Sequence, residues 1–220
     1  GTVNVLEACR YNKVKKFVYA ASASCYGIVE KRIGENSKIS LEHPYALSKY
    51  LGERAVFHWY KIYNLPVNSI RIFNAYGPRV RTTGAYGAVI GVFFKQKIKN
   101  KPMTIVGDGK QSRDFVHVSN IVHACMLAGE KQSNFQGAAF NVGTGQAMSI
   151  NELANVIFSD DVTPSYQPMR QGDVLHSCAS IDAIKQALGF QCLTNSAEAL
   201  RAMVNPTPQS CCSHQSTQCK

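Results

Sequence analysis

The chain has 220 residues, of which 45% are apolar and 17% are charged, and its formal net charge is +10. Such a chain can bury a core and form one or two domains, which excludes a generically disordered protein. The positive charge suits an anionic small molecule as well as a nucleic acid. The densest basic stretch, residues 95–101, is typical of a solvated helix end. We therefore expect no nucleic-acid partner.

The first third of the chain predicts a βαβ unit. Its elements are a helix over residues 2–12, a strand over 16–20, a helix over 44–64 and a strand over 67–73. The first strand is continuously apolar after its lysine, which is typical of a parallel sheet covered on both faces. We therefore expect an α/β fold. Apolar spacing predicts these buried helix positions: Val5, Leu6, Cys9, Leu51, Ala55, Trp59 and Ile62.

Beyond residue 78 the order and lengths of the predicted strands and helices change. The predicted elements are a helix over 86–98, a strand over 103–106, a tight turn over 107–109, a strand over 115–118, a helix over 119–131, a strand over 139–142, and helices over 149–158 and 181–188. Ser119 is expected to cap the helix that it begins. Ser149 and Glu152 have the spacing of a capping box.

Cysteine usage indicates a reducing compartment. Five of the eight cysteines are scattered through apolar segments and are expected to be buried thiols: Cys9, Cys25, Cys125, Cys178 and Cys192. The others lie near His214 in residues 205–220, which we expect to be a disordered or non-native tail, because the spacing matches no usual zinc site. The chain lacks the order of a signal peptide, and its longest apolar stretch is too short to span a bilayer. We expect a cytoplasmic protein with no metal and no membrane partner.

The pair of Tyr45 and Lys49 carries the chemistry. A Tyr and a Lys four residues apart lie on one face of a helix, and an ammonium beside a phenol lowers the phenol pKa from about 10, so that the oxygen can serve as a base. Ser22, at the end of the preceding strand, offers a hydroxyl that can bridge this phenol to a substrate hydroxyl. The spacing alone is weak, because Tyr11 and Lys15 match it too. A core tyrosine with a snorkelling lysine would have the same spacing without any catalytic role.

No Gly-x-Gly-x-x-Gly turn precedes this pair. In a Rossmann fold this turn joins the first strand to the first helix. About three more strand–helix units are needed before the strand that ends at Ser22. We therefore predict a Rossmann-like, doubly wound parallel sheet that lacks its N-terminal strands, with a smaller interleaved substrate-binding domain.

Six ordered motifs resemble the extended short-chain dehydrogenase/reductases that act on nucleotide sugars, over roughly residues 1–204. They are Ser22–Gly27, Tyr45 with Lys49, Arg71–Arg79, Gly107–Phe115, Phe140–Gly145 and Arg170–Ser177. Within this family the chain is most similar to the UDP-hexose 4-epimerases, especially those that take N-acetylated sugars.

The resemblance implies a catalytic site of Ser22, Tyr45 and Lys49, with NAD as cofactor. Tyr45 takes the proton from the sugar 4-hydroxyl, and Lys49 holds the nicotinamide ribose. The implied cofactor-binding residues are Ala20, Tyr45, Lys49 and Phe73. The implied substrate-binding residues are Ser22, Ser24, Asn74, Ala88, Val89, Arg113, Arg170, Asp173 and Ser177.

Several of these residues also have structural explanations. Arg113 and Arg170 resemble a diphosphate clamp, since guanidinium groups suit phosphate. Arg113 could instead form a surface ion pair with Asp114. Asn74 and Asp173 could serve as turn residues, and Ala88 and Val89 could belong to the core of a helix.

The resemblance implies epimerisation at C4 of a UDP-hexose through a 4-keto intermediate, for UDP-GlcNAc/UDP-GalNAc or UDP-Glc/UDP-Gal. Ala23 and Ser24 stand where 4,6-dehydratases carry an Asp-Glu pair, which disfavours dehydration. The Thr-Ser-Glu-like turn of UDP-glucuronate decarboxylases is also absent. Ser177 stands where the family controls room for the sugar 2-substituent, and a serine leaves space for an N-acetyl group. A non-catalytic, truncated binding module is a competing hypothesis of another class, because the chain lacks a pyrophosphate cradle.

We expect two domains. Residues 1–74 and 113–143 form the later part of an NAD-binding domain, and residues 75–112 and 144–204 form the substrate-binding domain. The helices at 2–12 and 44–64 resemble those of a four-helix dimer interface in the family, which implies a homodimer.

Overall fold

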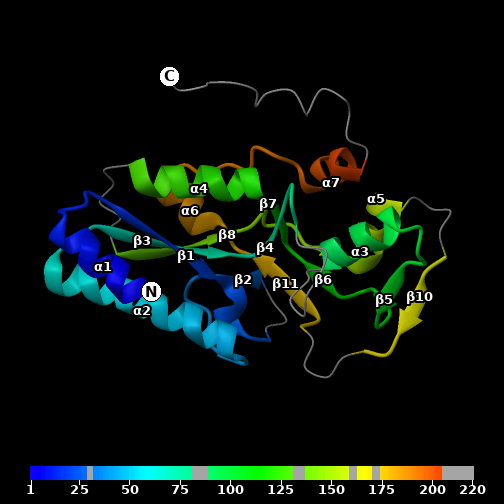
Figure 1. Ribbon diagram of the computed structural model, residues 1–220, viewed down its shortest axis with the longest axis horizontal. Helices are drawn as coiled ribbons and strands as arrows, with labels where there is room; N and C mark the ends of the chain where they lie inside the picture. The colour runs from blue at the N-terminus through cyan, green and yellow to red at the C-terminus, as the bar shows by residue number, and fades with distance from the viewer. Residues whose placement is uncertain (29–31, 81–88, 131–136, 159–162, 170–173, 205–220) are drawn as a thin grey trace, which may run out of the picture.

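The computed structural model describes residues 1–28, 32–80, 89–130, 137–158, 163–169 and 174–204 (Figure 1). The helices are α1 (Thr2–Tyr11), the 3-10 helix η1 (Ala23–Tyr26), α2 (Pro44–Tyr63), α3 (Val89–Ile98), α4 (Val118–Glu130), α5 (Ile150–Phe158), α6 (Asp182–Leu188) and α7 (Ser196–Val204). The strands are β1 (Phe17–Ser22), β2 (Arg32–Ile33), β3 (Val67–Ile72), β4 (Asn74–Tyr76), β5 (Thr104–Val106), β6 (Ser112–Arg113), β7 (Phe115–His117), β8 (Ala138–Val142), β9 (Met148–Ser149), β10 (Ser165–Gln167) and β11 (His176–Ala179).

A parallel sheet in the order β1–β3–β8 organises one end of the molecule. Phe17 pairs with Val67 at the start of the sheet, and Ser22 pairs with Ile72 at its carboxyl edge. Helices α1 and α2 cover one face, and α4 and α6 lie on the other (Figure 1). The middle strand, β3, is buried along almost its whole length. The α/β fold with a parallel sheet, predicted from the sequence, is confirmed.

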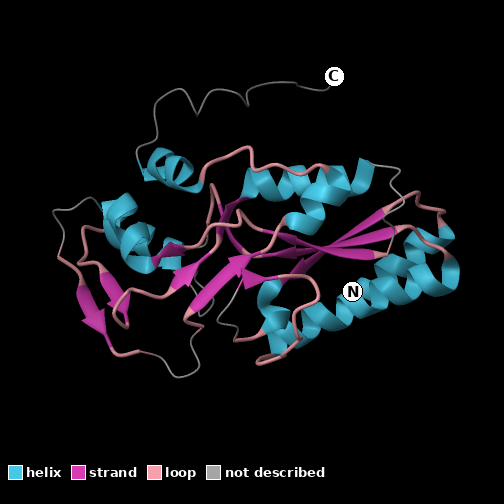
Figure 2. Ribbon diagram, turned by 180° about the vertical axis from the view of Figure 1, so that it is seen from behind, coloured by secondary structure: helices cyan, strands magenta, loops and turns pink. Residues whose placement is uncertain are grey.

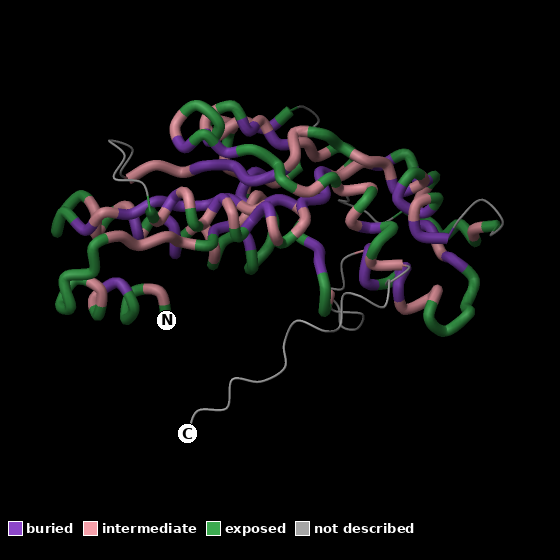
Figure 3. Tube along the Cα trace, turned by 90° about the horizontal axis from the view of Figure 1, so that it is seen from above, coloured by how far each residue is buried: buried purple, intermediate pink, exposed green. Residues whose placement is uncertain are grey.

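A second group of elements lies beside this sheet (Figure 2). Helices α3, α5 and α7 share an apolar cluster that includes Phe93, Leu153 and Leu200. Strand β11 joins the two groups, because it pairs in parallel with both β2 and β6. Viewed from above, the buried segments run through the strands, while the helices turn exposed residues outwards (Figure 3). None of the helices in the described ranges combines the length and the apolar character that a membrane crossing requires.

The buried face of α2 differs from the one that apolar spacing predicts. Leu51 and Ile62 are 57% and 53% exposed, so their predicted burial is wrong. The fully buried positions are Ala46, Gly52, Glu53 and Val56, while Ala55 and Trp59 are half-buried. The difference arises because small residues let α2 lie close to its neighbours and because Glu53 is buried as an ion pair, which a hydrophobic pattern cannot indicate. On α1, Leu6 is buried as expected and Cys9 is half-buried, but Val5 is exposed.

The helix ends show one correction and one confirmation. Helix α4 begins at Val118, and the expected cap at Ser119 is wrong, because the Ser119 amide itself donates to Nδ1 of His117 at 3.3 Å. His117 is therefore the capping side chain. The capping box at Ser149 and Glu152 is confirmed, since each side chain accepts a hydrogen bond from the other residue's backbone N–H.

The cysteines within the described residues are free thiols. Cys25 is buried, and this burial raises the pKa of its thiol to about 11. Three more, Cys9, Cys125 and Cys178, are half-buried, but Cys192 is exposed, so its predicted burial is wrong. Residues 205–220, with the remaining cysteines, lie outside the described part of the chain.

A buried ion pair connects α2 to the middle strand of the sheet. Arg71 Nε donates to Glu53 Oε2 at 3.0 Å, and Arg71 Nη2 donates to Glu53 Oε1 at 2.6 Å. Ser69 donates to the same carboxylate, and Arg71 also donates to the hydroxyl of Tyr26, which in turn donates to Asn141 on β8. Burial by itself lowers the pKa of Arg71, but the bonds to Glu53 and Tyr26 outweigh it, so the pKa is raised.

We expect Arg71→Met to destabilise the chain strongly. The substitution leaves the Glu53 carboxylate buried without its partner, which costs about 3–5 kcal/mol of the free energy of unfolding. Urea unfolding measures this loss. The double variant Arg71→Met/Glu53→Met removes both charges and should be less destabilised than the single variant. Lys110→Ala, which breaks an exposed pair with Asp108, is the control and should change little. A double variant weaker than Arg71→Met would contradict this account.

Candidate active site

Ser22 stands at the end of β1, where the chain turns into η1. Its Oγ accepts hydrogen bonds from the backbone N–H of Ser24 at 3.2 Å and from Oγ of Ser24 at 2.9 Å. Because these bonds use the acceptor side of the hydroxyl, its own proton remains for donation beyond the strand. Both serines line a cavity at this position.

Tyr45 and Lys49 lie in the first turns of α2. Nζ of Lys49 donates to the carbonyl oxygen of Ala20 at 2.9 Å, so the lysine reaches from the helix to β1. Tyr45 is 46% exposed, and its ring stacks on His43 with the ring centroids 6.2 Å apart. Nδ1 of His43 accepts from the Ala46 amide and caps the helix. The structure thus brings Lys49 to Ala20, while Tyr45 is not part of the lining of the serine cavity.

This cavity, of about 370 Å³, lies at the carboxyl ends of β1 and β3. Six residues predicted from the sequence line it: Ser22, Ser24, Phe73, Asn74, Arg113 and Ser177. Arg113 on β6 stands opposite Ser177 on β11 in the parallel register. The carboxyl ends of parallel strands are the usual ligand-binding edge of such sheets. Hydroxyl, amide and guanidinium groups in one cavity suit a polar, anionic small molecule.

Asp114 is a buried support of this cavity and not the surface ion-pair partner considered for Arg113. Its side chain is fully buried. The carboxylate accepts from the N–H and the hydroxyl of Thr144 at 2.8 and 2.7 Å, and from the N–H groups of Gly145 and Ala179 at 3.0 and 3.1 Å. Its carbonyl accepts from the backbone N–H and the side-chain amide of Asn74. Asp114 thereby fixes the loop after β8, the end of β11 and one wall of the cavity together.

A second cavity, of about 360 Å³, adjoins the first and shares Asn74 and Arg113 with it. Val89 lines it, with Ile90 and Phe93 from α3 and apolar residues of β5. Val89 is half-buried, so it can serve both as helix core and as cavity wall. Apolar walls beside a guanidinium suit a flat ring joined to a phosphate.

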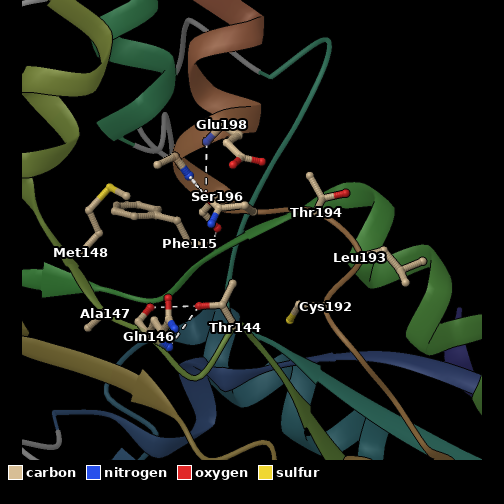
Figure 4. A pocket seen from close by; sticks show the side chains of 12 residues that line it. Phe115, Thr144, Gln146, Ala147, Met148, Cys192, Leu193, Thr194, Ser196 and Glu198 are labelled. Carbon is tan, nitrogen blue, oxygen red and sulfur yellow. Dashed lines mark hydrogen bonds between the residues drawn. The ribbon is translucent and has the colours of Figure 1, made fainter.

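A third cavity, of about 490 Å³, lies between the loop at Thr144 and the start of α7 (Figure 4). None of the residues predicted to bind substrate or cofactor, or to take part in catalysis, lines it. Its polar groups are largely paired with one another: the hydroxyl of Thr144 bonds Gln146, and the amides of Ala197 and Glu198 donate to Asn195. Although it is larger, its chemistry is less suited to an anionic ligand than that of the two smaller cavities.

Some predicted residues cannot be placed, and some cavity residues were not predicted. Ala88, Arg170 and Asp173 lie outside the described residues. Glu42 and His43 line the serine cavity but carry no motif of their own. Their position directly before the Pro-Tyr start of α2 is the signal that could have indicated them.

The residues predicted for NAD fit one part of that cofactor. Ala20 is exposed at the edge of β1, Lys49 crosses to it, and Phe73 is buried after β3. An ammonium has three donors, so Lys49 suits ribose hydroxyls. The 220 residues contain no Gly-x-Gly-x-x-Gly turn for the pyrophosphate. In the described part of the chain, no group of three His, Cys, Asp or Glu side chains is arranged to hold a metal ion.

Comparison with known proteins shows the family that the chain is similar to. A sequence model of the NAD dependent epimerase/dehydratase family matches residues 1–143. A putative UDP-glucose 4-epimerase of Methanocaldococcus jannaschii is 32% identical, over 93% of this chain and 67% of its own length. A UDP-N-acetyl-alpha-D-glucosaminuronate decarboxylase of Bacillus cytotoxicus is 34% identical, over 71% of this chain and 49% of its own length.

A solved structure extends the likeness to three dimensions. The UDP-N-acetylglucosamine 4-epimerase from Methanobrevibacter ruminantium M1, in complex with UDP-N-acetylmuramic acid, superposes with a TM-score of 0.86 at 31% identity. The match covers 92% of this chain and 66% of that structure. The chain spans about two thirds, or less, of the length of the curated relatives that it matches.

We expect Asp114→Asn to destabilise the chain and loosen the cavity wall. An amide cannot accept all the hydrogen bonds that the carboxylate accepts, and each buried donor left unpaired costs about 1–3 kcal/mol. Urea unfolding measures the loss. Asp108→Asn is the matched control, because Asp108 is exposed in a turn and its side chain accepts from the backbone N–H of Lys110. Equal losses in the two variants would contradict the role given to Asp114.

Proposed function

Because the chain belongs to the NAD-dependent epimerase/dehydratase family, we propose that it is the later part of an enzyme that epimerises a UDP-hexose at C4. The observation that carries the proposal is the meeting of six predicted residues, from separate segments of the chain, in the cavity of about 370 Å³ at the end of β1 and β3. NAD is the cofactor of the family, and the NAD prediction is confirmed at that level.

The proposed chemistry at C4 needs one base and one hydrogen-bond donor. Tyr45 is the proposed base for the proton of the sugar 4-hydroxyl. Ser22 is the proposed donor to the same oxygen, since Ser24 already occupies its acceptor side. Lys49 is the proposed ligand of the nicotinamide ribose. When bound, NAD would supply reversible hydride acceptance at C4, so that the sugar is isomerised without an external oxidant.

The proposed subsites follow the two adjoining cavities. Arg113 lines both cavities and is the proposed ligand of the diphosphate. Arg170 is proposed to bind the diphosphate with it, and Asp173 to bind the ribose. Both of these residues lie outside the described part of the chain. Asn74 also borders both cavities and is proposed to contact the sugar or the diphosphate. The second cavity, with Val89 in its wall and Ala88 beside it in sequence, is the proposed place of the uracil ring.

Epimerisation is favoured over the other reactions of the family by the residues after Ser22. Dehydration needs further acid and base groups, and neither Ala23 nor Ser24 titrates usefully. Decarboxylation is harder to exclude, because a 4-keto uronic acid loses carbon dioxide with little further help, but the Thr-Ser-Glu-like turn of such enzymes is absent. A decarboxylase does occur among the relatives, so the reaction is the part of the proposal that most needs a test. A non-catalytic binding protein is the second candidate, because these residues include no pyrophosphate cradle.

We also propose the domain division and the assembly. We assign the NAD-binding part to residues 1–74 and 113–143 and the substrate-binding part to residues 75–112 and 144–204. A separate apolar cluster of α3, α5 and α7 supports the second part, except around α6, where Ile184 and Leu188 pack in the cluster of the sheet. Apolar side chains exposed on α1 and α2 support a homodimer through these helices; they include Val5, Leu47 and Leu51. The proposed location is the cytoplasm.

We expect the complete protein, including any residues that precede Gly1, to interconvert UDP-GlcNAc and UDP-GalNAc without releasing carbon dioxide. Chromatography of the nucleotide sugars after incubation with NAD measures the reaction. Tyr45→Phe removes the proposed base and should lower kcat by at least about 100-fold. Formation of UDP-xylose from UDP-glucuronate would overturn the proposal. Binding of a UDP-sugar without NAD binding and without turnover would favour the binding protein.

We expect Ser177→Tyr to lower the activity on N-acetylated sugars more than on plain hexoses. Ser177 lines the sugar cavity, and a tyrosine there fills the room that the serine leaves for an N-acetyl group. The ratio of kcat/KM for UDP-GlcNAc and UDP-glucose measures the effect. Ser177→Ala, which keeps the room, is the control and should leave the ratio nearly unchanged. Equal losses on both sugars in Ser177→Tyr would sink this assignment.

A further inference from the structure

We infer that Tyr19 is a positioning residue for Lys49: its ring and its hydroxyl hold the lysine against the edge of β1. The importance of this contact rests on the proposed function, in which Lys49 binds the nicotinamide ribose of the cofactor and lies near the proposed base Tyr45. No motif in the sequence singles out Tyr19. The inference comes from contacts of both the side chain and the backbone of Lys49.

The first contact holds the ammonium. Nζ of Lys49 lies 5.6 Å from the centroid of the Tyr19 ring and 2.9 Å from the carbonyl oxygen of Ala20. A cation within about 6 Å of an aromatic ring is attracted to its face. Two consecutive residues of β1 thus bind the same ammonium, one through its ring and one through its backbone.

The second contact holds the backbone. The hydroxyl of Tyr19 donates to the carbonyl oxygen of Lys49 at 3.3 Å. A Cβ atom at Gly52 would lie only 2.1 Å from this hydroxyl and 2.8 Å from the ring carbon that bears it. Helix α2 therefore has a glycine where the tyrosine passes, and the ring fits closely between the strand and the helix.

The surroundings keep the Tyr19 hydroxyl a donor. Burial raises its pKa above the ordinary value, the hydrogen bond with Thr2 opposes this, and the charges of Glu53 and Tyr45 add to it. The phenol therefore stays protonated near neutral pH.

Holding Lys49 in advance has a chemical consequence. A lysine side chain has many rotamers, and ordering it only when a ligand arrives weakens binding. Tyr19 and Ala20 limit these rotamers and keep the ammonium at the end of β1, one helical turn from Tyr45. A leucine at position 19 would fill part of the space without attracting the ammonium.

The test measures the reactivity of Lys49 in the 220-residue chain. Reductive methylation at one pH, followed by mass spectrometry of each lysine, gives the rate at Lys49 relative to the exposed Lys61 in the same sample. We expect Tyr19→Leu to raise this relative rate by about threefold or more, as the loss of a contact of this strength allows. Tyr19→Phe keeps the ring and should stay within about twofold of the parent chain.

A matched control and an isosteric series separate positioning from general loosening. Tyr63→Leu removes another cation–π contact of α2, in which Arg10 lies 4.9 Å from the ring centroid, and should leave the rate at Lys49 unchanged. If Tyr19→Leu fails to fold, phenylalanines with one to five ring fluorines at position 19 keep the shape while weakening the attraction. The rate at Lys49 should then rise with each fluorine. A flat series, or an unchanged rate in a folded Tyr19→Leu, would overturn the inference.

The complete protein distinguishes failure of this inference from failure of the proposed function. If Tyr19 positions Lys49 for catalysis, Tyr19→Leu shifts the pH profile of kcat/KM and Tyr19→Phe restores it. A protein inactive on every UDP-sugar, with Lys49 protected as expected, would refute the proposed function and leave the positioning contact standing. An active epimerase in which Tyr19→Leu changes neither the labelling nor the pH profile would refute the positioning role alone.

Discussion

The ion pair between Arg71 and Glu53 is the interaction on which the arrangement of α2 and the sheet depends. It joins the middle strand to the helix that carries the Tyr-Lys pair, and both partners are almost completely buried. A buried charge needs its partner in one geometry, so the pair allows little sliding of α2 along β3. Through the hydroxyl of Tyr26, the same network reaches Asn141 on β8. One network therefore spans the helix, the turn after β1 and two strands.

The position of the candidate site follows from this constraint. With α2 fixed, Lys49 meets the carbonyl of Ala20 and the ring of Tyr19 at the edge of β1. A second buried carboxylate, Asp114, performs the corresponding task for the other half of the cavity. The groups proposed to meet substrate are thus held by two polar anchors that do not face the ligand themselves. This separation lets cavity residues such as Ser177 vary without unfolding the support.

Most of the long elements could be predicted because they depend on local patterns, whereas the residues of the main cavity were implied by ordered motifs that resemble a family. Apolar runs and helix signals mark β1, β3, α2 and α5, and ordered motifs mark Ser22, Asn74 and Arg113. Two of the shortcomings share a cause. The buried face of α2 was wrong because Glu53 is buried only through a partner 18 positions away. Asp114 and Tyr19 act through contacts 30 or more positions away, which no local pattern contains.

The pairing of β11 with β2 and β6 has a consequence for how the molecule comes to be folded. Cys178 stands beside Arg32, and Ser177 beside Arg113, so the wall of the cavity joins segments from the two ends of the described chain. Such non-local pairings form late and slowly, because closing a long loop costs conformational entropy before any contact between the strands can offset it. During synthesis on the ribosome the sheet, with helices α1, α2 and α4, can form first. The pocket is completed only when the strand near residue 176 has emerged, so a nascent chain has its framework before it has a binding site.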